Sequence, residues 1–103
     1  MKAVRLILYS REGCCLCEGL ERRLRSLSLK EFTPPIELFV IDIDAADTPK
    51  DLQVRYDLEV PVMLFESSGL KKMFELPRVS PRLNSEGLCQ WLQKILTKTV
   101  GTD

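Results

Sequence analysis

The stretch Gly13-Cys14-Cys15-Leu16-Cys17 places three cysteines within four positions, between two segments of different periodicity. Residues 4–9, which precede it, are almost continuously apolar and predict a strand that ends in the polar run 10–13. From Cys17 onward, apolar residues recur three or four positions apart, which predicts a helix with one apolar face formed by Cys17, Leu20, Leu24 and Leu27. The cysteines therefore lie where a strand gives way to a helix.

The middle of the chain predicts a second strand and a second helix. Thr33-Pro34-Pro35 is expected to stop the first helix, because proline cannot continue a helix. Residues 36–43 are nearly all apolar and predict a strand buried on both faces. Thr48 is expected to cap a short helix that has Pro49 at its first position and runs to about residue 56.

A hairpin and a last helix complete the predicted order. Residues 62–65 and 72–76 flank the turn Ser67-Ser68-Gly69 and predict two antiparallel strands. Asn84 or Ser85 is expected to cap a final helix with the apolar stripe Leu88, Leu92, Ile95 and Leu96. The order β-α-β-α-β-β-α predicts a right-handed parallel βαβ unit followed by a hairpin and a helix. We expect an α/β fold, a three-layer sandwich around a four-stranded mixed sheet.

Length, composition and charge restrict the class of protein. The 103 residues predict a single domain, 1–103, with an ordered core of about residues 3–98. Fifteen basic and fifteen acidic residues cancel, so we expect neither a nucleic-acid nor a membrane partner, since both favour an excess of positive charge. The sequence shows no signal peptide and no membrane span, which predicts a cytoplasmic protein. In that compartment four cysteines indicate catalysis or metal binding rather than structural disulfides.

The C-x-x-C pair Cys14 and Cys17 predicts thiol chemistry. A thiolate is the reactive form, and the free amides and dipole of a helix N-terminus stabilise it. Cys17 shares the stripe of the core leucines, so we expect it to be the buried resolving thiol and Cys14, before the helix, to be the exposed attacking thiol. Cys15 lies about 200° around the helix from Cys17 and is expected to be a bystander, although its participation stays open. Arg11 could stabilise the thiolate, whereas Glu12 and Glu18 would oppose it.

The segment LILYSREGCCLCEGLERRL, residues 6–24, together with Leu58-Glu59-Val60-Pro61-Val62, resembles the thioredoxin-fold superfamily. The nearest likeness is to small glutaredoxin-like proteins with a G-C-x-L-C motif. The resemblance implies a thioredoxin-like sandwich and a thiol–disulfide oxidoreductase. It also implies that Pro61 follows a cis peptide bond and faces the dithiol, and that the Val60 backbone pairs with a bound peptide. Val60 and Pro61 are thus expected substrate-binding residues. Arg11, from its place beside the motif, is expected to be a third, and Cys14 and Cys17 are expected to be catalytic.

The sequence departs from the family pattern in places that bear on the substrate. Gly13 stands where thioredoxins have tryptophan, and the first strand lacks their buried aspartate. Cys15-Leu16 replaces the aromatic residue that glutaredoxins carry inside the motif, and residues 77–82 replace their Gly-Gly pair. Arg78 and Arg82 could hold a carboxylate of glutathione or could be exposed loop arginines. We expect no bound cofactor, a disulfide-containing protein or glutathione as partner, and a monomer.

Two other functions remain open at this point. Clustered thiolates suit zinc or an iron–sulphur centre, with Cys89 as a fourth ligand, or a cluster shared between two chains through glutathione. Against that, the motif is crowded, the chain has no histidine, and Cys89 is expected to be a small core residue. The other possibility is a redox sensor or binding module that keeps the fold without turnover.

Overall fold

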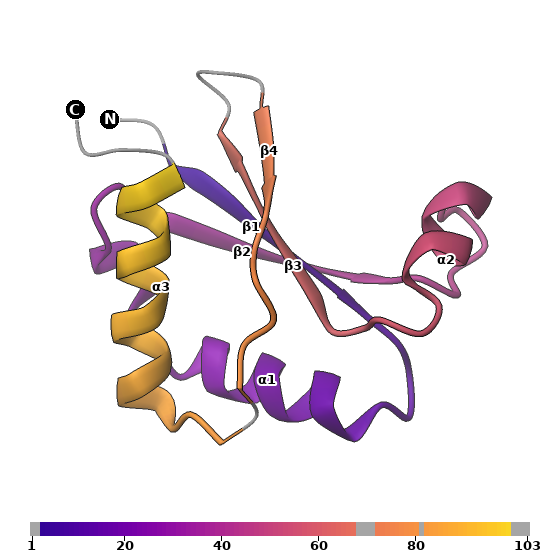
Figure 1. The fold of residues 1–103 in the computed structure, drawn as a ribbon, viewed down its shortest axis with the longest axis horizontal. Helices are drawn as coiled ribbons and strands as arrows, with labels where there is room; N and C mark the ends of the chain where they lie inside the picture. The colour runs from indigo at the N-terminus through magenta and orange to yellow at the C-terminus, as the bar shows by residue number, and fades with distance from the viewer. Residues whose placement is uncertain (1–2, 68–71, 81, 100–103) are drawn as a thin grey trace.

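A computed structural model describes residues 3–67, 72–80 and 82–99. Its elements follow the predicted order (Figure 1): β1 (Val4–Ser10), α1 (Cys15–Arg25), the 3₁₀ helix η1 (Leu29–Glu31), β2 (Ile36–Asp42), α2 (Lys50–Tyr56), β3 (Val62–Ser67), β4 (Lys72–Glu75) and α3 (Ser85–Thr99). Most of the turn expected at Ser67-Ser68-Gly69 lies outside these ranges, as do Pro81 and the residues after 99.

The four strands form one mixed sheet in the order β2-β1-β3-β4. β1 pairs in parallel with β2 and antiparallel with β3, and β4 pairs antiparallel with β3. β1 is therefore central. Its carboxyl end leads directly into the cysteine-rich turn (Figure 1), so an inner, largely buried strand of the sheet positions the candidate site.

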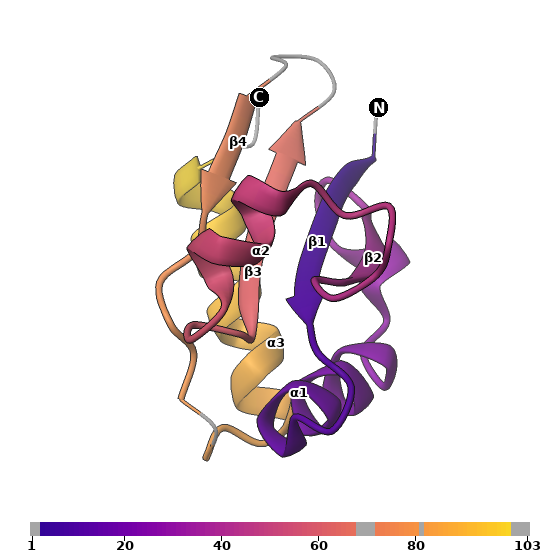
Figure 2. The ribbon, with the colours of Figure 1, turned by 90° about the vertical axis from the view of Figure 1, so that its right-hand side faces the viewer.

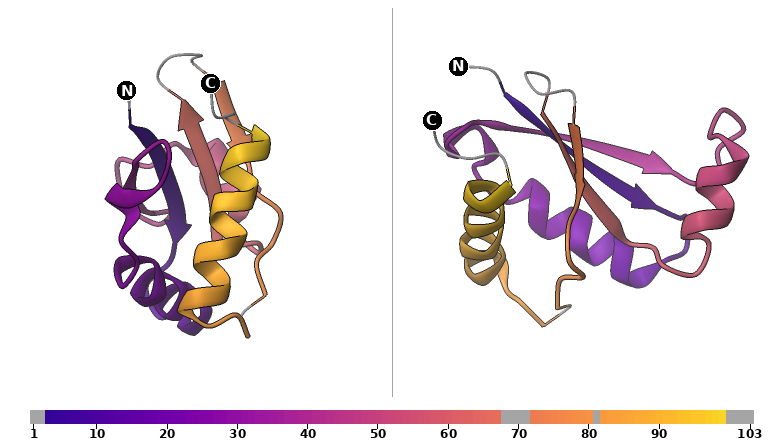
Figure 3. Two further views of the ribbon diagram at one scale, coloured as in Figure 1. Left: turned by 90° about the vertical axis from the view of Figure 1, so that its left-hand side faces the viewer. Right: turned by 45° about the horizontal axis from the view of Figure 1, so that its top comes forward.

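Alternate residues of the sheet face two separate cores. Leu6 and Leu8 point toward α1 and α3, which cover one face together (Figure 3). Ile7 and Tyr9 point to the other face, where Tyr56 of α2 stacks on Tyr9 with ring centroids 5.1 Å apart. Figure 2 shows that α2 covers this face near the end of β1 that leads to the cysteines. These layers are the predicted three-layer arrangement.

The prediction that residues 36–43 are buried on both faces is wrong. β2 is an edge strand, and its burial alternates: Ile36 is buried, Glu37 is exposed and Phe39 is 43% exposed. In the described part of the chain, β2 pairs with one strand only, β1, so its other edge is open. The helix α2 has only seven residues and does not cover the full length of β2. Phe39 is instead approached by the guanidinium of Arg5, whose carbon lies 5.8 Å from the ring centroid.

Two helix boundaries differ from the prediction. α1 ends at Arg25, well before the proline pair, because Ser26 turns the chain and its hydroxyl donates to the Arg23 carbonyl at 2.6 Å. Leu27 therefore packs on the core from a loop. At α2 the cap is Pro49, and the Thr48 hydroxyl donates to the Asp42 carbonyl at 2.8 Å instead of capping.

The start of α3 agrees with the prediction. The Asn84 side chain accepts a hydrogen bond from the Gly87 amide at 2.8 Å, and Leu88, Leu92 and Leu96 are buried. In the part of the chain that the structure describes, no helix is long and apolar enough to cross a membrane.

Candidate dithiol site

Cys14 and Cys17 form a disulfide at the start of α1. Cys14 is the N-cap residue, and its sulfur accepts a hydrogen bond from the Cys17 amide at 3.2 Å. Cys17 is fully buried, as its place on the leucine stripe predicts. Cys14 is half-buried. The predicted pair is thus joined, with one sulfur in the core and the other near the surface.

A tight turn explains why the helix begins at this sulfur. The Cys14 amide donates to the Arg11 carbonyl at 3.2 Å, and Gly13 has a φ of 82°. A positive φ at the third residue of a turn favours glycine. The Cys14 carbonyl then accepts the first helical bond, from the Glu18 amide at 3.0 Å. Backbone geometry therefore directs the Cys14 sulfur at the free amides of the first turn.

Cys15 is the exposed thiol of the motif, and it is free. The expectation that Cys14 would be the exposed member is met only in part, because Cys14, which is bonded to buried Cys17, is half-buried. Cys15 is the first residue of α1 and lies outside the buried face of that helix, which Cys17, Leu20 and Leu24 form. That Cys14 attacks and Cys15 is a bystander stays a prediction.

Arg11 contacts two carboxylates that the sequence analysis did not single out. Its Nε and Nη2 donate to the Asp44 carboxylate at 2.7 and 3.1 Å. Its Nη2 also donates to the Asp57 carboxylate at 2.6 Å, and its Nη1 donates to the Asp57 carbonyl at 2.8 Å. Within the protein, all three nitrogens of the guanidinium thus donate to Asp44 or Asp57. That Arg11 contacts a substrate stays a prediction.

Asp44 and Asp57 could have been suspected from their placement at loop ends. Asp44 follows β2 and Asp57 follows α2, and both segments lead to the same end of the sheet as Arg11. The Arg11 guanidinium holds the pKa of Asp44 below its usual range, helped by a hydrogen bond from the Gln53 amide at 3.1 Å. Asp44 is therefore ionised at neutral pH.

The Val60–Pro61 peptide bond is cis. The Val60 amide donates to the Tyr56 carbonyl at 3.2 Å, so within the protein this amide already has an acceptor. Pro61 and Leu16 line a small cavity of about 80 Å³. The proline segment and the cysteine motif therefore lie on the same cavity. Its other lining residues are Leu20, Arg23, Arg78 and Val79.

The two loop arginines occupy different positions. Arg78 lines the small cavity, and its Nη1 donates to the Glu59 carbonyl at 2.9 Å. Arg82 is exposed and is not among the residues of that cavity. The structure therefore brings Arg78, and not Arg82, to the cavity shared with Leu16 and Pro61.

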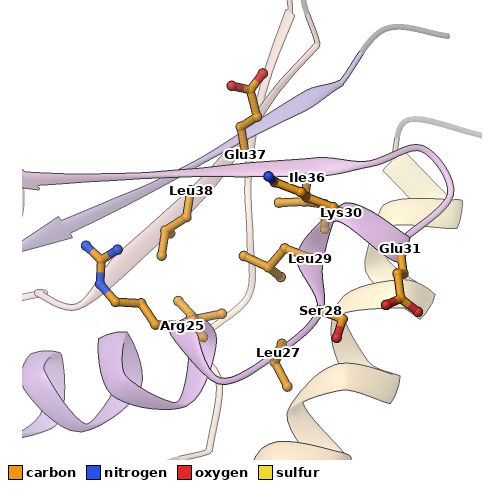
Figure 4. A pocket seen from close by; sticks show the side chains of 10 residues that line it. Arg25, Leu27, Ser28, Leu29, Lys30, Glu31, Ile36, Glu37 and Leu38 are labelled. Carbon is orange, nitrogen blue, oxygen red and sulfur yellow. The ribbon is translucent and has the colours of Figure 1, made fainter.

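Cys89 lies apart from the motif. It is half-buried, packs against the main core and lines a cavity of about 830 Å³ between α3 and the segment after α1. A neighbouring cavity of about 630 Å³, lined by η1, β2 and the segment after α1 (Figure 4), shares Leu27, Ser28 and Glu31 with it. Neither cavity is lined by Cys14, Cys15 or Cys17. Among residues 3–67, 72–80 and 82–99, no three histidine, cysteine or acidic side chains are grouped to hold a metal ion.

Comparison with known proteins identifies the fold. A family model described as "Glutaredoxin-like domain (DUF836)" matches residues 5–93. No curated protein sequence matches the chain. Thioredoxin O2 from Arabidopsis thaliana, in its oxidised state, aligns with a TM-score of 0.58 at 18% identity, over 93% of this chain and 74% of that one. The poxviral disulfide oxidoreductase G4 aligns with a TM-score of 0.60 at 14% identity, over 90% and 94%. The predicted thioredoxin-like fold is confirmed.

Proposed function

The chain belongs to the glutaredoxin-like (DUF836) family, and from that premise we propose that it is a thiol–disulfide oxidoreductase that uses Cys14 and Cys17. The observation that carries the proposal is the Cys14–Cys17 disulfide, with Cys14 at the cap of α1 and Cys17 buried beneath it. A half-buried cysteine whose sulfur lies beside the amides of the first helical turn is suited to attack, and a buried neighbouring thiol is suited to resolve the product.

The reaction begins with the reduced protein. The Cys14 thiolate attacks one sulfur of a substrate disulfide, forms a mixed disulfide and expels the other substrate sulfur as a thiolate, which takes up a proton. The Cys17 thiol then loses its proton and attacks the Cys14 sulfur. This step expels the second substrate thiolate and closes the disulfide seen here. Two electrons pass from the protein to the substrate, and a thiol reductant restores the dithiol.

The cis Val60–Pro61 segment and Leu16 are the proposed docking residues. Leu16 is 53% exposed, and Pro61 lines the same small cavity. The Val60 carbonyl would accept from the amide of an extended substrate, in the manner of an added strand. The Val60 amide would contribute only after leaving the Tyr56 carbonyl, so we propose that substrate pairing relies on the carbonyl.

A disulfide-containing protein is the proposed partner, and glutathione is the alternative. The poxviral protein G4 is a disulfide oxidoreductase essential for cytoplasmic disulfide bond formation, and this likeness supports a protein substrate for the present chain. Arg78 at the small cavity favours glutathione, because a guanidinium binds a carboxylate in two-pronged fashion. A cytoplasmic location, a monomeric state and the absence of a bound cofactor belong to the same proposal.

Two reductants distinguish these partners. The purified oxidised protein is incubated either with glutathione or with thioredoxin reductase and NADPH, and loss of the Cys14–Cys17 disulfide is followed by mass spectrometry. Reduced protein is then tested on insulin and on a glutathionylated peptide. Turnover of either substrate, lost in Cys14→Ser, supports the proposal. A dithiol that closes and opens without turning over either substrate contradicts it and favours a redox sensor.

A further inference from the structure

The Arg11 side chain connects three segments that meet at the dithiol end of the sheet. Arg11 itself follows β1, Asp44 follows β2, and Asp57 follows α2. The guanidinium binds the Asp44 carboxylate through two nitrogens and binds Asp57 through both its carboxylate and its backbone carbonyl. A two-pronged arginine–carboxylate pair fixes orientation as well as distance. We name this set of residues, Arg11, Asp44 and Asp57, the loop clamp.

The backbone on either side of the loop clamp leads directly to the reactive groups. The Arg11 carbonyl accepts the Cys14 amide at 3.2 Å, so the residue that is held by two carboxylates also holds the cap of α1. Asp57 lies four positions before Pro61. Between them, the amides of Glu59 and Val60 both donate to the Tyr56 carbonyl, at 3.0 and 3.2 Å. The loop clamp therefore joins the Cys14 turn to the segment that contains the cis bond.

The charges of the loop clamp do not favour a thiolate. One guanidinium faces two carboxylates, which leaves a net charge of −1 for the three side chains. Two further acidic side chains near the motif, Glu12 and Glu18, are exposed. A field from this group would raise the cost of a negative sulfur, because like charges repel at short range. Any benefit of the loop clamp to the reaction therefore comes from geometry.

We propose that Arg11 is a positioning residue, which holds Cys14 and the Val60–Pro61 segment in a fixed relation by binding Asp44 and Asp57 at once. The inference rests on the proposed thiol–disulfide exchange. Attack on a disulfide needs the substrate backbone at Val60 and the sulfur of Cys14 in one alignment. Misplacement of reacting groups by about 1 Å can cost on the order of 100-fold in rate. Without the loop clamp, the segment after β2 that holds Asp44 and the segment after α2 that holds Asp57 would move independently of the Cys14 turn.

The experiment compares Arg11→Gln, Arg11→Lys, Asp44→Asn and Asp57→Asn in a Cys15→Ser background. The readouts are kcat/KM for insulin reduction and the pH midpoint of iodoacetamide alkylation at Cys14 in the reduced protein. If Arg11 acts by position, all four variants lower kcat/KM, Arg11→Gln by about 10- to 100-fold, and all raise the midpoint. Lysine fails to rescue because a single ammonium cannot hold both partners.

A field effect gives a different pattern. In that case Arg11→Lys resembles the unsubstituted protein, and Asp44→Asn and Asp57→Asn shift the alkylation midpoint downward, opposite to Arg11→Gln. Either result overturns the inference. Arg25→Gln is the matched control, since it breaks an exposed pair with Glu21 at 2.8 Å at the far end of α1 and should change neither readout.

The two proposals can fail separately. If the unsubstituted protein turns over no disulfide substrate, the proposed function fails, and the alkylation midpoints still decide whether the loop clamp positions Cys14. If the protein is active and the clamp variants match it in both readouts, the positioning role of Arg11 fails alone. Asp44 and Asp57 have side chains 42% and 53% exposed, so their asparagine variants keep the shape of the loops and should fold.

Discussion

Cys14 and Cys17 are joined twice, by their disulfide and by a hydrogen bond from the Cys17 amide to the Cys14 sulfur at 3.2 Å. When the disulfide opens, the amide remains in the backbone of α1 and can donate to a thiolate in the same place. A charge-assisted bond of this kind is stronger than a neutral one. The helix therefore offers the reduced Cys14 a donor that the oxidised protein already positions.

Replacing the buried cysteine should trap an intermediate. In Cys17→Ser, attack by Cys14 survives while the resolving step is lost, so a mixed disulfide with the substrate should accumulate. Mass spectrometry of the unreduced protein should find the substrate on position 14. Cys14→Ser should abolish turnover, and Cys15→Ser should change the rate only modestly. If alkylation in single-cysteine variants is faster at position 15 than at position 14, the assigned roles are wrong.

Alanine substitutions at Gly13 and Gly19 should change the stability of the protein in opposite directions, one through backbone strain and the other through helix propensity. Gly13 has a φ of 82°, and nothing lies within 4 Å of the place that a Cβ would occupy, so Gly13→Ala should lose about 1 kcal/mol of stability from strain alone. Gly19 lies inside α1 and is equally open, so Gly19→Ala should gain about 0.5–1 kcal/mol. Urea titration of the oxidised proteins measures both changes. Equal shifts in the two variants would show that the Gly13 turn does not need its positive φ.

The stacked tyrosines predict a loss of stability in alkali. Burial raises the pKa of Tyr9 and that of Tyr56. At Tyr56 the carboxylate of Glu75 adds to the rise in pKa, whereas the guanidinium of Arg55 opposes it. The folded protein therefore holds the phenolic protons of Tyr9 and Tyr56 more tightly than the unfolded chain does, where the pKa of tyrosine is about 10. The stabilising contribution is complete below about pH 10 and is lost as the pH rises through the folded values.

Thermal melts between pH 8 and 11 measure this effect. Tyr56→Phe should flatten the decline above about pH 10, because one shifted group is removed. At pH 8 the same variant should cost about 0.5–1.5 kcal/mol, since it also removes the hydrogen bond to Glu75 at 3.2 Å. If the melting temperature of Tyr56→Phe falls with pH as steeply as that of the unsubstituted protein, a group other than Tyr56 causes the loss of stability in alkali.

Arg78 and Arg82 provide a matched test of glutathione binding. Both are exposed loop arginines, but only Arg78 lines the cavity beside Leu16 and Pro61. Arg78→Ala should raise KM for a glutathionylated peptide by roughly tenfold, the usual worth of a charge-assisted bond, and leave kcat nearly unchanged. Arg82→Ala should change neither constant. Equal effects of the two variants would indicate a general attraction of anions rather than a site.

The order of the elements could be predicted because local patterns determine most of it. The leucine stripe of α1, the Asn84 cap and the paired apolar runs of β3 and β4 all appear in the structure where the sequence indicates them. The same stripe predicts that Cys17 is buried, and it is. Such features depend on residues close together in the chain.

The errors concern properties that depend on distant segments. An apolar strand such as β2 looks the same in sequence whether it lies in the centre or at the edge of a sheet, and here it lies at the edge. The ion pairs of Arg11 span 33 and 46 positions, so no local pattern indicates them. The end of α1 depends on the side-chain bond of Ser26, which competes with helix continuation.

The exposed free Cys15 affects how the redox state of this protein is measured. Closing the Cys14–Cys17 disulfide leaves two thiols, one exposed at position 15 and one half-buried at position 89. A thiol reagent added to the folded oxidised protein will thus give a rapid signal from Cys15 that has no relation to the dithiol. Labelling experiments would report this protein as reduced when its reactive pair is oxidised. A Cys15→Ser, Cys89→Ser protein makes the thiol content a direct measure of the Cys14–Cys17 pair.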